Sequence, residues 1–421
     1  MSSLASKPRS RRDAAVAFAV YVAVLTAAYY YSLTFVQLGV TGFGIERLGL
    51  SPDLVAVAMG VLAVTTLAAT LVSGRLLDRV GSLRSVRSKF RVLFGIVLLQ
   101  LAVTDAVTAV ASFAGFLAWI LVCSVLLGTA IPFTFSLLSD LVAPEKRGYA
   151  AGTVAGFAFF LAALFPFRWT IEGFVPAAIA VLAPVAVLLG VLSIPAVRTD
   201  RFTHVARRND DEETRPGMLS AAFLGGILLL FGAFFVDSLG FVRIVEAPQY
   251  VDASWQSSDI GTRMLIASTH VVGGIAAGVV YTKTRYVWLF FATFVLFAAA
   301  QFLYVYDIVL GGPAVLATLL PLVYVLAVSC YTTVAFALWP DLATPETVGT
   351  YTAVGIGIGG WLATFTSTAV ALVSERLRLP LELHLLVVVV ASVGFLFVTV
   401  LLLYGRERLD PRTRTPTRIE R

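Results

Sequence analysis

Long apolar runs alternate with short polar segments along the whole chain. A run of roughly 20 apolar residues is long enough to cross the hydrocarbon core of a membrane as a helix. The runs that meet this length with few charged residues predict twelve membrane-spanning helices. They lie at residues 14–38, 53–77, 92–111, 114–140, 149–168, 174–197, 217–243, 261–281, 287–307, 313–339, 349–373 and 382–404. The expected fold class is therefore an all-α membrane protein of twelve transmembrane helices.

Two sequence repeats divide these helices into two pseudo-symmetric bundles of six. The segment from Asp140 to Gly148 recurs 201 residues later, from Asp341 to Gly349, with five of nine residues identical. Near an offset of 204, Gly74 corresponds to Gly278. Parallel repeats of this kind are typical of several transporter folds. The expected organisation is an N-terminal bundle (1–197), a cytoplasmic linker (198–216), a C-terminal bundle (217–404) and a cytoplasmic tail (405–421).

Composition supports a surface in contact with lipid. Of the 421 residues, 59% are hydrophobic and 13% charged, whereas soluble domains carry about 25% charged residues. The net charge of +6 does not indicate nucleic-acid binding, because the basic residues lie at the ends of apolar runs. With a cytoplasmic N-terminus, 25 of the 31 Lys and Arg residues fall on the cytoplasmic side. We expect both termini in the cytoplasm. Arginine far exceeds lysine and the loops are short, which favours a prokaryotic cell membrane.

The most distinctive polar segment runs from Gly74 to Arg84 and joins the second and third apolar runs. Its sequence is GRLLDRVGSLR. Because charged residues are costly in the hydrocarbon core, we expect this segment to form a turn at a membrane surface. Gly74 and Gly81 are expected to allow a sharp turn and close helix packing. The segment resembles the loop between helices 2 and 3 of the major facilitator superfamily. That resemblance implies a secondary transporter that works by alternating access.

The resemblance also implies a gating latch. In the family, the residue that matches Asp78 contacts the start of helix 11, here near residues 349–351. The residue that matches Arg79 reaches a carboxylate at the end of helix 4, here Asp140. Both contacts form while the cytoplasmic side is closed. Since Thr282 stands where the repeat would place a second aspartate, we expect only one strong latch.

The sequence departs from the family at two positions that bear on energy coupling. The position four residues before Gly128 is Ser124, where many proton-coupled members carry an arginine. The fifth run lacks the Gly-Pro pair of the drug antiporters in this family, which weakens the assignment of drug efflux with proton exchange. Drug or metabolite efflux, nutrient uptake, uniport and coupling to a cation all remain open.

Substrate contact in the family comes mainly from helices 1, 4, 7 and 10. Ionisable residues within spans are candidates for such a cavity or for coupling, because their burial in lipid is costly. His270 is expected near mid-depth, either as a titratable site or as a neutral imidazole bonded to a neighbouring helix. The remaining candidates for the cavity are Asp105, Asp237, Tyr30, Tyr324 and Trp361.

Other classes of function have weaker support. The chain has no phosphate-binding Gly-Lys-Ser/Thr loop, and its histidines and cysteines are too scattered to suggest a metal cluster. We expect no cofactor and no enzymatic activity. The expected partners are a small-molecule solute and the lipid bilayer, for a monomeric protein. A receptor that does not transport, or a membrane-embedded enzyme, is the alternative.

Overall fold

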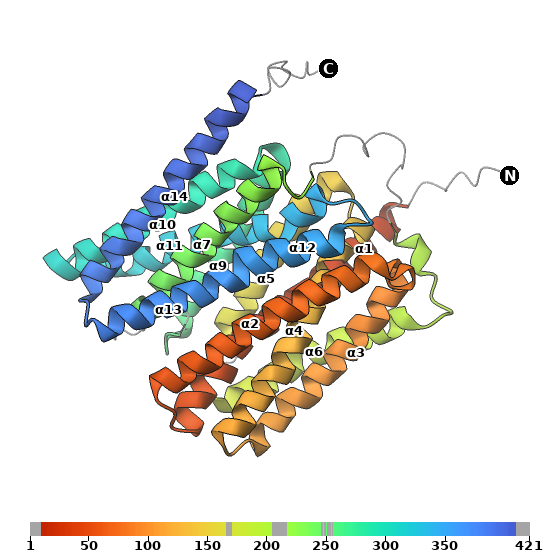
Figure 1. Cartoon of the computed structure of the whole chain (residues 1–421), viewed down its shortest axis with the longest axis horizontal. Coiled ribbons are helices and arrows are strands. Elements are labelled where there is room, and N and C mark those ends of the chain that lie inside the picture. The colour runs from red at the N-terminus through yellow and green to blue at the C-terminus, as the bar shows by residue number, and fades with distance from the viewer. Residues whose placement is uncertain are drawn as a thin grey trace.

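The computed structural model describes residues 10–165, 171–203, 217–245 and 256–409, together with Ala247, Tyr250 and Ser254. Within them the regular structure is entirely helical. Twelve helices are long and apolar enough to cross a membrane, and each overlaps one of the twelve predicted spans. The helices form two bundles that lie side by side (Figure 1), one coloured red to yellow-green and the other green to blue. The predicted fold class is confirmed.

The first bundle contains six long helices. They are α1 (Arg11–Thr34), α2 (Pro52–Arg79), α3 (Val86–Ala106), α4 (Phe113–Leu141), α5 (Arg147–Leu164) and α6 (Ile171–Ser193). The first helix continues without a break into a π-helical segment, η1 (Phe35–Arg47), which makes that span longer than predicted. Short 3-10 turns occur at η2 (Gly81–Arg84), η3 (Val107–Ala109), η4 (Pro144–Lys146) and η5 (Thr199–Arg201).

The second bundle repeats the plan. Its helices are α7 (Ala221–Val245), α9 (Ile260–Lys283), α10 (Tyr286–Leu310), α11 (Ala314–Leu342), α12 (Val348–Ile356), α13 (Ala363–Arg376) and α14 (Leu381–Leu409). The π-helical segment η6 (Gly357–Leu362) joins α12 to α13, so that these three form the eleventh span. Most of the predicted linker, residues 204–216, and the end of the predicted tail, residues 410–421, lie outside the described residues.

Polar side chains define several helix starts. Ser85 and Ser112 accept the backbone N–H groups of Ser88 and Gly115 at the starts of α3 and α4. Such N-caps satisfy amides that have no partner within the helix. The cap at Ser112 explains how the shortest predicted turn, between the third and fourth spans, separates two helices.

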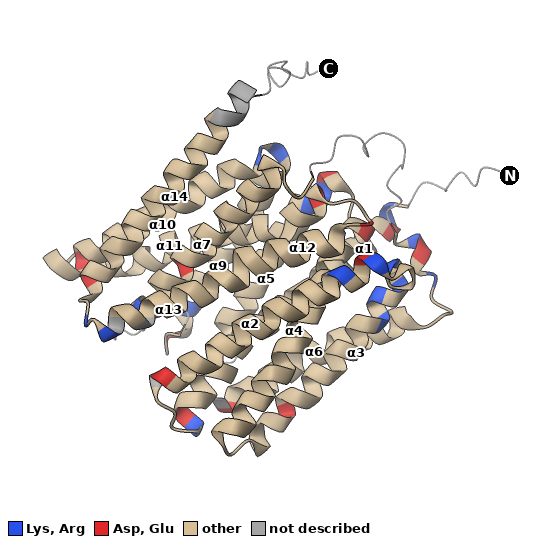
Figure 2. Cartoon of the chain, in the orientation of Figure 1, with Lys and Arg blue, Asp and Glu red and all other residues tan. Residues whose placement is uncertain are grey.

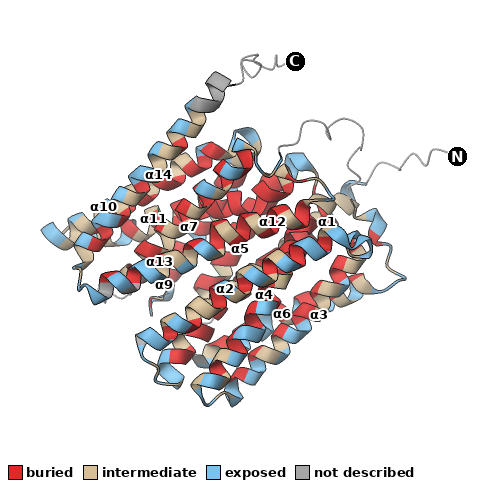
Figure 3. Ribbon diagram, in the orientation of Figure 1, coloured by how far each residue is buried: buried red, intermediate tan, exposed pale blue. Residues whose placement is uncertain are grey.

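The surface matches a lipid environment. Large apolar side chains face outward along the helices, such as Val272 at 66% exposure, Phe397 at 62% and Val390 at 72%. Figure 3 shows the buried residues in the interior of the bundles. Charged residues lie mainly at the ends of the helices (Figure 2). The protein is therefore a multi-pass membrane protein.

We call one end of the molecule the basic end. It carries the α2–α3, α4–α5 and α9–α10 connections, where the exposed cations include Arg79, Arg84, Lys146, Lys283 and Arg285. The opposite end carries the α1–α2, α3–α4 and α13–α14 connections. This definition rests on the topology of the chain and assigns no side of the membrane.

Two seams of small residues hold the bundles together. In the first seam, α2 packs against α12, and a Cβ atom on Gly349 would lie 2.5 Å from the carbonyl oxygen of Gly74. In the second, α5 packs against α9, and a Cβ atom on Gly278 would lie 2.6 Å from the carbonyl oxygen of Gly148. In lipid there is little hydrophobic drive between helices, so such close contact stabilises their association. The four glycines correspond in the sequence repeat, which makes the two seams pseudo-symmetric.

We expect the stability of the protein to depend on glycine at position 152. Gly152 faces Gly274 across the second seam. A Cβ atom there would overlap with the carbonyl oxygen of Gly274 and with the backbone of Gly278. We expect Gly152→Val to destabilise the protein by about 2 kcal/mol or more, because overpacking typically costs 1–3 kcal/mol. Thermal unfolding of the purified protein measures this effect.

The matched control is Gly95→Val in α3, where a Cβ atom meets no other atom within 4 Å. Equal melting temperatures for the two variants would show that the second seam does not limit stability.

Candidate functional site

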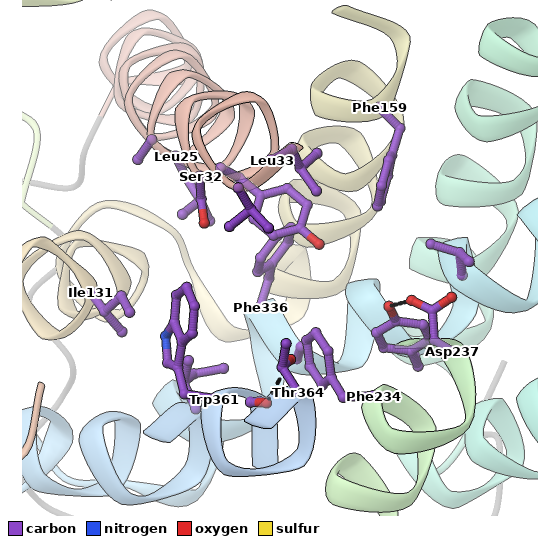
Figure 4. A pocket seen from close by; sticks show the side chains of 18 of the residues that line it. Leu25, Ser32, Leu33, Ile131, Phe159, Phe234, Asp237, Phe336, Trp361 and Thr364 are labelled. Carbon is purple, nitrogen blue, oxygen red and sulfur yellow. Dashed lines mark hydrogen bonds between the residues drawn. The ribbon is translucent and has the colours of Figure 1, made fainter. Parts of the chain in front are cut away.

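A cavity of about 270 Å³ lies between the two bundles. Residues from α1, η1, α3, α4, α5, α7, α9, α11, α12, η6 and α13 line it. Most of the wall is aliphatic or aromatic, and Figure 4 shows the rings of Phe234, Phe336 and Trp361 around the space. A mainly apolar pocket with a few polar groups is the usual form of a small-molecule site. This volume is at the lower end of the common range of roughly 300–1,000 Å³.

The carboxylate of Asp237 is the main polar group of the cavity. Its Oδ1 accepts a hydrogen bond of 2.5 Å from the hydroxyl of Tyr324, and its Oδ2 accepts one from the hydroxyl of Tyr331. Asp237 is on α7 and both tyrosines are on α11, seven residues apart and hence on one helix face. Within the described lining, Asp237 is the only acidic residue and there is no Lys or Arg.

His270 lines the same cavity from α9. Its ring stacks on that of Phe159 with centroids 4.2 Å apart, and its Nδ1 lies 3.2 Å from the hydroxyl oxygen of Ser329 on α11. The Ser329 hydroxyl donates to the carbonyl of Val325, so it is free to accept from an Nδ1–H group. We assign the Nδ1–H tautomer on this basis. His270 is therefore both bonded to a neighbouring helix and in contact with the cavity.

The cavity contains four of the six predicted candidates. Asp237, His270, Tyr324 and Trp361 line it, but Tyr30 does not. The Tyr30 hydroxyl instead donates to the carbonyl of Phe165 over 3.3 Å, in a small separate cluster. The preceding residue, Tyr29, faces the cavity, because successive residues in a helix are turned by about 100°.

Asp105 is also absent from the cavity. The helix α3 begins at Val86, six residues before the predicted start, and ends at Ala106. Asp105 is therefore exposed at the end of this helix, away from the basic end. The polar residue of α3 that does line the cavity is Gln100, which is buried. An amide in the middle of an apolar run was the sequence signal for it.

At the basic end, Asp78 bridges the two bundles. Its Oδ1 accepts the backbone N–H of Gly349 over 2.9 Å, and its Oδ2 accepts that of Thr350 over 2.6 Å. These amides are at the start of α12, where N–H groups have no partner within the helix and the helix dipole favours a negative charge. The contact predicted for Asp78 is present. Gly74 permits the close approach of α2 that this contact requires.

The predicted contact between Arg79 and Asp140 is wrong. Asp140 instead forms an ion pair with Lys89, whose Nζ lies 2.6 Å from Oδ2, while Arg79 is exposed. Lys89 is on α3, and its side chain is only 3% exposed. The pair joins α3 to α4 within one bundle and does not bridge the two.

The predicted role of Gly81 is also not seen. Its backbone does not adopt a positive φ, and a Cβ atom there would meet nothing within 4 Å. Instead, the guanidinium of Arg84 donates to the backbone carbonyl of Asp78, at the end of α2. A cation at the carboxyl end of a helix is favourable for the helix dipole.

A second charged contact bridges the bundles at the basic end. Nη1 of Arg147 lies 2.7 Å from Oδ1 of Asp341 and also donates to the carbonyl of Pro340 over 3.2 Å. The Tyr281 hydroxyl donates to the other carboxylate oxygen of Asp341 over 2.8 Å. Arg147 begins α5, and its side chain is 7% exposed. This contact was not predicted, although Arg147 and Asp341 both belong to the repeated segment.

The bundles also meet at the opposite end. Nε of Arg263 on α9 donates to the carbonyl of Ala163 on α5 over 2.6 Å. The ion pair between Arg376 and Asp53 joins α13 to α2 over 3.0 Å, with both side chains more than 60% exposed. Exposed pairs contribute little to stability, about 0–1 kcal/mol. The cavity thus has contacts between the bundles on both sides of it.

Comparison with known proteins identifies the architecture. No family model and no curated protein matches this sequence. A bacterial homologue of the iron transporter ferroportin, in an outward-facing state, is similar with a TM-score of 0.59 at 13% identity, over 93% of this chain and 100% of that one. The proton:xylose symporter XylE, described as a major facilitator superfamily protein and bound to 6-bromo-6-deoxy-D-glucose, is similar with a TM-score of 0.64 at 11% identity, over 93% and 95%. The chain has the major facilitator superfamily fold.

In this facilitator fold, the first, fourth, seventh and tenth spans all contribute to the cavity, as expected from the resemblance. These spans correspond to α1, α4, α7 and α11. A smaller cavity of about 70 Å³ lies between α2 and α13 and shares Trp361 and Thr364 with the main one. No group of three or more metal-ligating side chains occurs among the described residues.

The corrected ion pair yields a prediction. We expect Asp140→Asn to destabilise the protein by about 3 kcal/mol, because it leaves the buried Lys89 ammonium without its counter-charge. Thermal or denaturant unfolding measures the difference. Arg79→Gln, the control, should change stability by less than about 0.5 kcal/mol, as for other exposed positions. A larger loss of stability in the Arg79 variant than in the Asp140 variant would contradict the pairing of Asp140 with Lys89.

Proposed function

We propose that the protein is a secondary transporter, which moves a small solute across the cell membrane by alternating access. The observation that carries this proposal is the cavity between the two bundles, with polar contacts between the bundles on both sides of it. Breaking one set of contacts at a time would open the cavity to one side of the membrane at a time. Such rocking of one bundle against the other is how many secondary transporters work.

The proposed moving units are residues 1–197 and 217–404, joined by the linker 198–216. We place the basic end in the cytoplasm, with both termini, since connections rich in Lys and Arg face that side. The cytoplasmic gate then consists of Asp78 with the start of α12, and of Arg147 with Asp341. Buried polar contacts of the described residues join the bundles at this end, which supports a conformation closed to the cytoplasm.

Flux through a bilayer tests the proposal against the alternatives of a receptor and a membrane enzyme. A thermal-shift screen of solutes on the purified protein first identifies a ligand. Proteoliposomes with and without a pH gradient then measure its accumulation. A transporter accumulates or equilibrates the ligand across the bilayer, whereas a receptor binds it without flux and an enzyme converts it. Stimulation by the pH gradient would indicate proton coupling.

We expect Asp78→Asn to slow flux at least about fivefold while the affinity for the ligand stays within threefold. The amide group lacks the negative charge and the second acceptor oxygen, and a hydrogen bond to a charged group is worth about 1.5–3 kcal/mol. The cavity is remote from this position, so binding should persist. The control is Asp53→Asn, which removes an exposed contact at the other end of the same helix. Unchanged flux in the Asp78 variant would refute its role as a latch.

Arg147→Gln should likewise slow flux, because it breaks the second buried contact of the proposed gate. Its neighbour Lys146 is exposed and has the same charge, so Lys146→Gln is a matched control. The effect of Arg147→Gln should disappear in a background that already carries Asp341→Asn. Additive effects of the two substitutions would mean that the pair does not act as a unit.

A further inference from the structure

We propose that the central cavity binds an organic monocation, with Asp237 as its counter-charge and the aromatic side chains as its walls. This inference rests on the proposed transport function and names the class of solute. It starts from the charge of the cavity: one carboxylate, one imidazole and no Lys or Arg among the described lining residues. A charge within the membrane-spanning region is costly, so an ionisable group retained there is a functional candidate that needs a partner.

Two tyrosines hold this carboxylate in place, and no Lys or Arg among the described residues pairs with it. Each oxygen of Asp237 accepts a hydrogen bond from one tyrosine hydroxyl, and neither tyrosine carries a charge to offset the carboxylate. Both donors come from α11, which fixes the orientation of the carboxylate. The single negative charge is therefore available to a ligand, while part of its hydrogen-bonding capacity is already used. A quaternary or tertiary ammonium group, which needs charge more than acceptors, matches this arrangement.

The other walls suit the same ligand. Tyr29 meets Phe336 edge to face with centroids 4.9 Å apart, and Phe234 meets Tyr331 in the same manner at 4.9 Å. Trp361 adds an indole from the π-helical segment η6. In Figure 4, Asp237 lies at one side of the cavity and Ile131 at the other, with the rings of Phe234, Phe336 and Trp361 between them in this view. Aromatic faces attract cations, most strongly away from water.

The same features disfavour other solutes. An anion would meet the carboxylate with no Arg or Lys in the described lining to offset it. A sugar would leave many hydroxyl groups without partners against the aliphatic and aromatic wall, and each unpaired polar group costs about 1–3 kcal/mol. A cation with one charge and an apolar body satisfies both the carboxylate and the rings.

The test uses benzyltrimethylammonium as a probe, with benzyl alcohol as its uncharged comparison. Isothermal titration calorimetry on the purified full-length protein measures both. We expect Asp237→Asn to weaken binding of the cation at least tenfold and that of the alcohol less than twofold. The matched control is Asp105→Asn, since Asp105 is an exposed acid outside the cavity. An equal effect on both probes, or none on the cation, would overturn the proposal.

A second variant keeps the charge and removes a ring, in case Asp237→Asn does not fold. Trp361→Leu should weaken binding of the cation at least threefold with Asp237 intact, through loss of the indole face. Undiminished binding of the cation in this variant would contradict the aromatic part of the site. Binding that depends on Asp237, without flux in proteoliposomes, would support this inference and refute transport. Flux of another solute that the cation does not inhibit would support transport and refute this inference.

Discussion

Helices in a lipid bilayer gain little from burying apolar surface against one another, and the structure follows from this constraint. Association must come from close packing and from polar contacts. The two glycine seams supply the close packing between the bundles, and bonds such as that of Asp78 to the amides of Gly349 and Thr350 supply the polar contacts. The glycine contacts lie toward the basic end, whereas polar contacts occur at both ends of the bundles, and the cavity lies between the two sets of polar contacts. A site enclosed by separable contacts is what alternating access requires.

The pseudo-symmetry of the two seams holds for the four glycines nearest the basic end and is broken in the charges. Gly74 faces Gly349 in one seam, as Gly278 faces Gly148 in the other. The aspartate of the first seam is matched by Thr282, whose hydroxyl bonds within its own helix to the carbonyl of Gly278. Beside the second seam, the ion pair of Arg147 with Asp341 joins α5 to α11. The two sides of the basic end are thus joined by different chemistry.

Sequence patterns predicted what depends on local spacing. The twelve spans follow from apolar length alone, whereas the contact of Asp78 with the start of α12 was expected only through the resemblance of the 74–84 segment to the major facilitator superfamily. The prediction for Asp105 was wrong because its depth depends on where α3 starts. The helix starts six residues earlier than predicted, and Asp105 is therefore exposed at its end and does not line the cavity. The prediction that Tyr30 lines the cavity was wrong because successive side chains on a helix are turned by about 100°, and Tyr29 faces the cavity instead.

The choice of Lys89 over Arg79 as the partner of Asp140 could not be predicted from the motif. It depends on which face of α3 packs against α4, and both cations lie at the basic end. The π-helical segment η6 poses a similar problem for Trp361, because a π turn shifts the register of every later side chain on the helix. The glycine run from Gly355 to Gly360 indicates where the helix departs from α-helical geometry, but it does not indicate how far the register shifts.

The helix α11 connects the cavity with the contacts at the basic end. It carries Tyr324 and Tyr331, which bind Asp237, and it carries Asp341, which pairs with Arg147 ten residues beyond Tyr331. Ten residues of helix span about 15 Å, so one continuous helix reaches from the cavity to the basic end. A displacement of α11 that loosens the tyrosines from Asp237 would also strain the pair of Asp341 with Arg147. The Tyr324 and Tyr331 hydroxyls that bind Asp237 are therefore on the same helix as Asp341 of the proposed gate, and a movement of α11 displaces all three groups.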